Sequence, residues 1–132
     1  MASGLTTAER NRYLTANYKT ATVYGACCTS DPSDAAVMSG KEASGSAYAR
    51  TVIVFNDDAA AGTISNTTAV EFPAASGGNW GTISHLAICS TDVEDADTAI
   101  ASGALTASKV IDDGDQLVFA IGNITVAVAA QA

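Results

Sequence analysis

Positive charge is scarce in this sequence: six Lys and Arg residues stand against fourteen Asp and Glu residues, for a net charge of −8 over 132 residues. A nucleic-acid binder needs clustered Lys and Arg to neutralise phosphates, and an anionic membrane surface attracts the same side chains. No apolar run approaches the roughly 20 residues of a membrane span, and the N-terminus lacks the pattern of a signal peptide. We therefore expect neither nucleic acid nor membrane as a partner, and a chain that is made in the cytoplasm.

Aromatic residues are scarce as well, at 6% of the chain, although hydrophobic residues as a whole reach 48%. The large side chains available for a core are Trp80, Phe55, Phe72 and Phe119, with Ala and β-branched residues to fill the rest. Such a composition favours thin β layers, and it favours burial shared with neighbouring subunits. The length is that of one domain.

The cysteines are too few and too irregularly spaced for a disulfide framework or a zinc site. Cys27 and Cys28 are adjacent, and neighbours on a strand point to opposite faces, so a bond between them would be strained. Cys89 stands alone. We interpret all of them as small, buried hydrophobic residues.

Residues Leu5–Thr20 are the best helix candidate, because Thr6 and Glu9 have the spacing of a capping box and no Gly or Pro interrupts the segment. After residue 20 the sequence shows short strands separated by turn residues. The expected strands are 21–29, 50–56, a weaker one within 63–74, 81–89, one or two within 99–111, and a final pair at 116–121 and 124–129.

This pattern predicts a mainly β protein, an antiparallel, jelly-roll-like β-sandwich with one short N-terminal helix. Strands with turn signals every 8 to 12 residues or so are typical of sandwiches and small barrels and not of parallel α/β sheets. We expect an N-terminal arm and helix at 1–20 and the β-sandwich domain at 21–132.

One short segment, GNWGTISHLAICS, gathers the only tryptophan, Trp80, the only histidine, His85, and Cys89. Four residues of extended strand separate His85 from Cys89 by about 13 Å, so the two cannot form a nucleophile–base pair within the strand. A contact of His85 with Cys27 or Cys28 depends on the fold, and we favour a structural histidine. We predict no catalytic site and no cofactor, because no other enzyme motif occurs.

Two acidic stretches are candidates for calcium ligation, because Ca²⁺ prefers oxygen ligands from loops. The first, DVEDAD, contains Asp92, Glu94, Asp95 and Asp97, and the second, DDGD, covers 112–115. Neither has the spacing of an EF-hand loop. We favour solvated acidic turns over metal sites, with a tight hairpin turn at DDGD.

Six short motifs occur in an order that resembles a known family. They are Asp31-Pro32, Tyr48 with Arg50, Phe72-Pro73, Trp80-Gly81-Thr82 with His85, Gly103–Thr106, and Gly114-Asp115 through Phe119. Over nearly the whole chain they resemble small virion proteins of tailed bacteriophages that are labelled "phage tail fibre-like". One departure is ACCTS, which stands where that family has a strand end containing Leu-His. The resemblance implies a β-sandwich component of the virion.

The resemblance leaves two roles open. In the one that we favour, the protein is a capsid decoration or cement protein that binds the outside of the shell, with itself as a homotrimer and the major capsid protein as partners. The chain is short and lacks the heptad or β-helical shaft of a fibre, which supports this role. In the alternative, the protein is a tail or tail-fibre component, and the loops 39–47 and 90–99 contact the host surface.

Two sets of residues are candidates for assembly contacts. The first set lies in the N-terminal segment, which holds three of the six basic residues, and we expect it to bind neighbouring virion proteins: Arg10, Arg12, Tyr13 and Lys19. The second set is expected at a structural or oligomer seam: Tyr48, Arg50, Trp80 and His85. Tyr48 and Arg50 are spaced by two residues and share a strand face, where they can brace a carboxylate.

Overall fold

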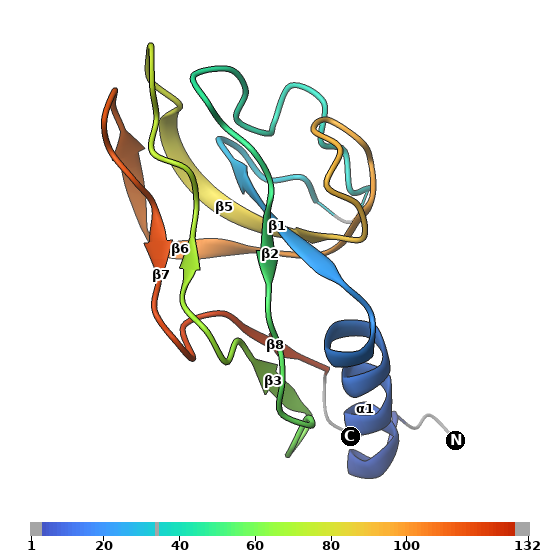
Figure 1. Cartoon of the computed structure of the whole chain (residues 1–132). Helices are drawn as coiled ribbons and strands as arrows, with labels where there is room; N and C mark the ends of the chain where they lie inside the picture. Colours follow the sequence, from blue (N-terminus) through green and yellow to red (C-terminus); the bar gives the residue numbers. More distant parts are fainter. Residues whose placement is uncertain (1–3, 34, 129–132) are drawn as a thin grey trace. The chain divides into compact units, whose positions relative to one another are not determined.

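The computed structural model describes residues 4–33 and 35–128. The elements in chain order are α1 (Thr7–Leu14), the π-helical segment η1 (Thr15–Thr20), β1 (Val23–Cys28), β2 (Thr51–Ile53), β3 (Thr63–Ser65), β4 (Val70–Glu71), β5 (Gly81–Cys89), β6 (Ala99–Ile111), β7 (Val118–Phe119) and β8 (Thr125–Ala127) (Figure 1). Contacts within the chain divide it into unit 1, with Met1–Thr22, Ile53–Val70 and Phe119–Ala132, and unit 2, with Val23–Val52 and Glu71–Val118.

The helix of unit 1 begins at Thr6, whose Oγ1 accepts a hydrogen bond from the Glu9 N–H at 3.3 Å. This N-cap is the one that the capping-box spacing predicts. The helical segment buries Leu14 and Tyr18, and the Tyr18 ring meets Phe55 edge-on at a centroid distance of 5.7 Å. Beside α1, β3 pairs with β8 in antiparallel register (Figure 1). The helix and this two-stranded sheet together form the core of unit 1.

Asn66 organises the turn that precedes β8. Its backbone N–H donates to the Ile124 carbonyl at 3.1 Å, and its backbone carbonyl accepts from the Gly122 N–H at 3.0 Å. Its side-chain amide donates to the Ala120 carbonyl at 3.1 Å, and its side-chain oxygen accepts from the Ile124 N–H at 2.9 Å. Because Asn66 is only 2% exposed and Ile124 only 6%, these bonds satisfy the buried polar groups of Asn66 and the buried backbone of Ile124.

The final strand pair that the sequence predicts, 116–121 with 124–129, is wrong. In the structure β7 pairs with β4, and β8 pairs with β3. Residue 129 lies outside the described residues. The Gly122-Asn123 turn is present, but the polar groups around it bond to Asn66, a residue far away in the sequence. A turn motif in the sequence does not show whether the two strands that flank it pair with each other.

Unit 2 contains the larger sheet, whose strand order is β2-β1-β5-β6. The central strand β5 has the bounds that the sequence predicts, and it pairs antiparallel with β1 and with β6. The last four residues of β5, Leu86–Cys89, are all buried, and the register with β6 shifts between Ile83 and His85 and again between Ile88 and Cys89. The expected buried strand at 50–56 is shorter, and Val52 is 45% exposed because β2 lies at the edge of the sheet.

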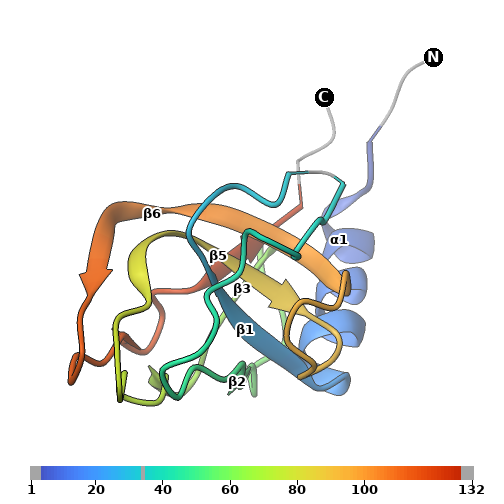
Figure 2. The same cartoon turned by 90° about the horizontal axis from the view of Figure 1, so that it is seen from above.

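The other edge of this sheet is β6, a single strand of 13 residues where the sequence predicts one or two short ones. Figure 2 shows β6 running as a long band beside β5. Most of its residues are exposed, including Ile100 at 44% and Val110 at 59%. An edge strand is solvated on one side along its backbone, so its sequence does not need the hydrophobic pattern of a core strand.

The structure confirms a mainly β protein with antiparallel sheets and one N-terminal helix. Among residues 4–33 and 35–128 the sheets have four, two and two strands, and the closed, jelly-roll-like sandwich that the sequence predicts is not shown. The expected boundary between 1–20 and 21–132 is not tested by the two contact units and stays a prediction. Within residues 4–33 and 35–128, no helix is both long and apolar enough to cross a membrane.

Candidate functional site: two loops joined by a buried ion pair

The Glu42–Arg50 ion pair lies in unit 2, and both side chains have no exposed surface. Arg50 Nη2 donates to Glu42 Oε1 at 2.8 Å, and Arg50 Nε donates to Glu42 Oε2 at 2.9 Å. Such parallel bonds match the planar fork of a guanidinium to a carboxylate. Burial of two charges is costly unless their remaining hydrogen-bonding groups are also satisfied.

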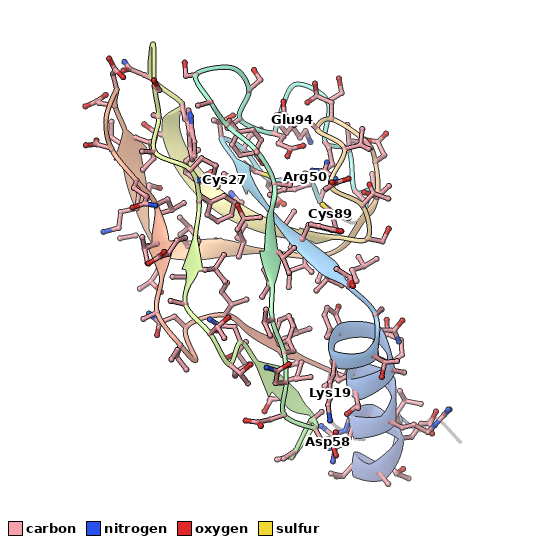
Figure 3. The ribbon with its side chains drawn as sticks, in the orientation of Figure 1. Lys19, Cys27, Arg50, Asp58, Cys89 and Glu94 are labelled. Carbon is pink, nitrogen blue, oxygen red and sulfur yellow. The ribbon has the colours of Figure 1, made fainter. Side chains whose placement is uncertain are left out.

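The rest of the Arg50 guanidinium binds the loop 90–99. Nη1 donates to the Thr91 carbonyl at 3.0 Å and to Thr98 Oγ1 at 3.1 Å, and Nη2 donates to the Ala96 carbonyl at 2.9 Å. All five guanidinium N–H groups therefore have an acceptor. Figure 3 shows Arg50 and Glu94, a member of this loop, at the same end of unit 2.

The Glu42 carboxylate belongs to the other loop, 39–47, and it also has its acceptors occupied. Glu42 Oε1 accepts from the Asp95 N–H at 2.9 Å, and Glu42 Oε2 accepts from the Tyr48 hydroxyl at 2.5 Å. Both members of the ion pair, Glu42 and Arg50, therefore hydrogen-bond to the loop 90–99, and they connect the loop 39–47 to it. Within the loop 39–47, Glu42 and Ala43 are buried.

Tyr48 and Trp80 complete the support of the first loop. The Tyr48 hydroxyl accepts from the Cys27 N–H at 3.0 Å, and burial raises its pKa far above the ordinary value, with the bond to Glu42 adding to the rise. The hydroxyl therefore stays protonated and donates to Glu42. Trp80 packs edge-on against Tyr48 at 5.1 Å, and its Nε1 donates to the Ser46 carbonyl at 3.0 Å.

Tyr48, Arg50 and Trp80 therefore share one structural arrangement, which the sequence groups as a seam. They are all buried within the chain, with exposures of 5%, 7% and 5% for the whole residues, backbone included. His85 has a different hydrogen-bond partner, since its Nδ1 shares a hydrogen bond with Ser84 Oγ at 2.8 Å. Whether any of these residues supports an oligomer seam stays a prediction, and a buried residue would act there through the loops that it holds.

The cysteines are free thiols and are buried. Cys28 lies opposite His85 in the register of β1 and β5, which is one of the two thiol–imidazole pairings that the sequence left open. Burial raises the pKa of Cys28 to about 12, and its Sγ donates to the Ala26 carbonyl at 3.9 Å. A thiol that stays protonated and has no exposed surface is a poor nucleophile, so this pairing is structural.

In both acidic stretches, a carboxylate accepts a hydrogen bond from a backbone N–H group. Asp97 Oδ1 accepts from the Met38 N–H at 2.8 Å, and in the DDGD turn Asp115 Oδ2 accepts from the Asp112 N–H at 3.0 Å. The Asp115 N–H also donates to the Asp112 carbonyl at 2.9 Å, which confirms a tight turn. The expected hairpin is wrong, because β6 pairs with β5 and β7 pairs with β4, and the two do not pair with each other. In the described part of the chain, no group of three or more His, Cys, Asp or Glu side chains is arranged to share a metal ion.

The N-terminal candidates differ in their surroundings. Arg12 is 75% exposed in its side chain and Tyr13 is 48% exposed, so both are available to a neighbour. Arg10 is 9% exposed, with Nη1 on the Val128 carbonyl at 3.2 Å, and Lys19 pairs with Asp58 at 2.7 Å. The structure does not test the expected role of this set in assembly.

Sequence reasoning missed Glu42, the partner of Arg50. The available signal was indirect: Glu42 is the only acid between Asp34 and Asp57, and a buried Arg nearly always has an acidic partner. Its role depends on the path of the loop 39–47, which the sequence does not reveal.

Comparison with known proteins identifies the kind of protein that carries these loops. A search of curated proteins gave no significant match. A family profile described as "Podophage GP4 fiber I protein gp80" matches residues 7–127, which is most of the chain. This description supports the tail-fibre alternative better than the capsid cement role that the sequence favoured. Proteins of this family are structural and not enzymes. The chain belongs to the Podophage GP4 fiber I protein gp80 family and is a fibre protein of a phage virion, where it associates with other virion proteins.

Proposed function

We propose that this fibre protein contributes to attachment at the host surface through the loops 39–47 and 90–99. The observation that carries the proposal is the buried Glu42–Arg50 pair. It joins the two loops that would contact the host surface if the protein is a tail-fibre component. Binding residues are commonly placed on loops that a rigid scaffold holds. A fully hydrogen-bonded ion pair beneath both loops provides such a scaffold.

The exposed surface of the loop 90–99 defines the chemistry of the partner. Asp92, Val93, Glu94 and Asp95 are exposed there, and Val93 is exposed to 59%. Partial burial raises the pKa of Glu94, and the charges of Glu42 and Asp95 add to the rise. Carboxylates around an exposed apolar side chain favour a partner with positive charge or uncharged polar groups and disfavour an anionic one.

Phage particles that carry altered loops test this proposal. The variant Asp92→Asn/Val93→Ser/Glu94→Gln is expected to slow adsorption to host cells by about tenfold or more, because it removes the charge and the apolar contact together. The matched control is Val110→Ser, since Val110 on β6 is also 59% exposed. Normal adsorption by particles that contain the loop variant in normal amount would disprove the proposal.

We further propose that the protein assembles as a homotrimer and binds other virion proteins through Arg12 and Tyr13. Both side chains are exposed on α1, whereas Leu14 and Tyr18 of the same segment are buried. Deletion of the whole segment would therefore damage the core of unit 1, and surface substitutions are the sharper test. Particles with Arg12→Glu/Tyr13→Ser are expected to contain less of the protein, with the melting temperature of the purified variant unchanged.

Copy number in purified particles separates the fibre role from the capsid cement role. A fibre subunit is expected in the low copy number of tail components, and a cement protein in a copy number like that of the major capsid protein. The jelly-roll-like closure of the β-sandwich also stays a proposal, which an experimental structure of the oligomer would test.

A further inference from the structure

A second surface feature lies in unit 1, where a pocket of about 310 Å³ opens beside β3. This volume is at the small end of the range of about 300–1,000 Å³ that is typical of ligand sites. Its lining residues include Asp57, Asp58, Thr63, Ser65 and Ile121. Carboxylates, hydroxyls and exposed aliphatic surface thus occur together around one small hollow.

The carboxylates on the pocket wall favour a ligand with a positively charged group. Asp58 Oδ1 binds the ammonium group of Lys19 at 2.7 Å, and the two side chains lie next to each other in Figure 3. The neighbouring Asp57 is exposed and makes no hydrogen bond or ion pair with any described residue. The pocket therefore already holds one amino group of the chain at its wall, and a second carboxylate is available to an incoming one.

The hydroxyl groups on the wall retain acceptor capacity. Thr63 Oγ1 donates to the Ala60 carbonyl at 3.1 Å, and Ser65 Oγ shares a hydrogen bond with Thr125 Oγ1 at 2.7 Å. A hydroxyl has two acceptor lone pairs, so both groups can still accept hydrogen bonds from a ligand. Ile121 is 67% exposed and offers an apolar surface at the rim.

We propose that this pocket binds one neutral or amino-bearing hexose unit of a surface glycan. The hydroxyls of the sugar would donate to Asp57, Thr63 and Ser65, and its C–H face would pack on Ile121. The two carboxylates exclude sugars with a carboxylate or phosphate group, because the chain holds no cation at the pocket other than the Lys19 that Asp58 already binds, within the described residues. The significance of such binding for adsorption rests on the proposed function, whereas the binding itself does not.

No aromatic side chain lines the pocket, so affinity for a single sugar is expected in the millimolar range. A weak site suits a fibre, because several copies that bind one glycan surface together gain avidity through effective concentration.

Titration of the purified full-length protein with monosaccharides tests the proposal, with NMR chemical shifts of backbone amides as the readout. Glucosamine and glucose are expected to shift amides within 57–67 and at Ile121, and glucuronic acid is expected to cause no shift there. Asp57→Asn is expected to weaken glucosamine binding about two- to fivefold, the size of an exposed charge pair, with glucose binding less affected. The control Asp112→Asn removes the same charge from a turn in unit 2 and is expected to change nothing.

Several results would overturn the pocket proposal: glucuronic acid binding as well as glucosamine, shifts outside the pocket residues, or no change with Asp57→Asn. Adsorption assays distinguish failure of the pocket proposal from failure of the proposed function in host attachment. If Asp57→Asn weakens sugar binding but the particles adsorb normally, the pocket proposal holds and its link to attachment fails. If no sugar binds and the loop variant still slows adsorption, the pocket proposal fails and the proposed function stands.

Discussion

The Arg50 guanidinium and the Glu42 carboxylate are joined by two hydrogen bonds, and neither side chain has exposed surface. The pair is eight residues apart in the chain, and between them they bond the backbone of the loop 90–99 at Thr91, Asp95 and Ala96. Buried charges are stable only when every polar group has a partner. The position of each loop therefore depends on the other.

Loss of this pair should destabilise the protein strongly. In Arg50→Met the Glu42 carboxylate stays buried without its counter-ion, which costs about 3–5 kcal/mol of unfolding free energy. The double variant Glu42→Leu/Arg50→Met should recover part of this loss, because no unpaired charge remains. Urea denaturation measures the effect. The control is Arg12→Met at the exposed Glu9–Arg12 pair, which should leave the stability unchanged.

Alkaline pH should destabilise the protein through its buried thiols. Burial raises the pKa of Cys28 from 9.0 to about 12, and it also raises the pKa values of Cys27 and Cys89. Above pH 9 the unfolded chain releases these protons first, so it binds fewer protons than the folded chain and unfolding becomes easier as pH rises. The loss is at most about 1.4 kcal/mol per pH unit for each thiol.

The window for this effect runs from pH 9 to 12 for Cys28, and stability should be nearly independent of thiol titration below it. Urea denaturation at about pH 8, 9.5 and 10.5 measures the slope of unfolding free energy against pH. Cys28→Ala should make that slope shallower. An equal slope in this variant would show that Cys28 titrates alike in the folded and unfolded states.

Asn66→Ala should cost about 1–3 kcal/mol, because the buried Ile124 N–H loses its acceptor, whereas the exposed Ala120 carbonyl keeps the Asn123 N–H as a donor. Asn123 is the matched control, since it lies in the turn to which Asn66 bonds and is exposed. Asn123→Ala should change the stability by less than about 0.5 kcal/mol. Thermal unfolding of the two variants compares them, and equal losses would assign the effect to the turn sequence rather than to the buried amide.

Gly62→Ala should be more harmful than Gly40→Ala. Both glycines have left-handed φ values, +76° and +75°, so both substitutions carry the same backbone strain. A Cβ at Gly62 would lie 2.0 Å from Arg10 Nη1, whereas a Cβ at Gly40 meets nothing within 4 Å. Arg10 is nearly buried and bound to the Val128 carbonyl, so relieving the clash should cost about 1–3 kcal/mol more. Comparison of the two melting temperatures checks the difference.

Local signals in the sequence predicted local structure well. The Thr6 cap, the bounds of β5 and the DDGD turn follow from neighbours within a few residues, and the structure confirms them. Tyr48 and Arg50 do bind one carboxylate, as their spacing suggested, although both precede β2 and the carboxylate itself was not identified. Patterns that depend on strand partners were less accurate, as the final strand pair and the length of β6 show.

The sequence by itself determined the class of the protein: a charge balance that opposes nucleic acid, a β-rich pattern, and motifs of a phage virion protein. These properties arise from composition and from short-range order, which do not require knowledge of the path of the chain. Only the tertiary structure decided that Glu42 forms an ion pair with Arg50 and that Asn66 hydrogen-bonds to the turn before β8. It also decided that Asp57 and Asp58 line a pocket together with Ile121. Each of these contacts joins residues through packing and hydrogen bonds between separate segments, and no local pattern in the sequence specifies which segments meet.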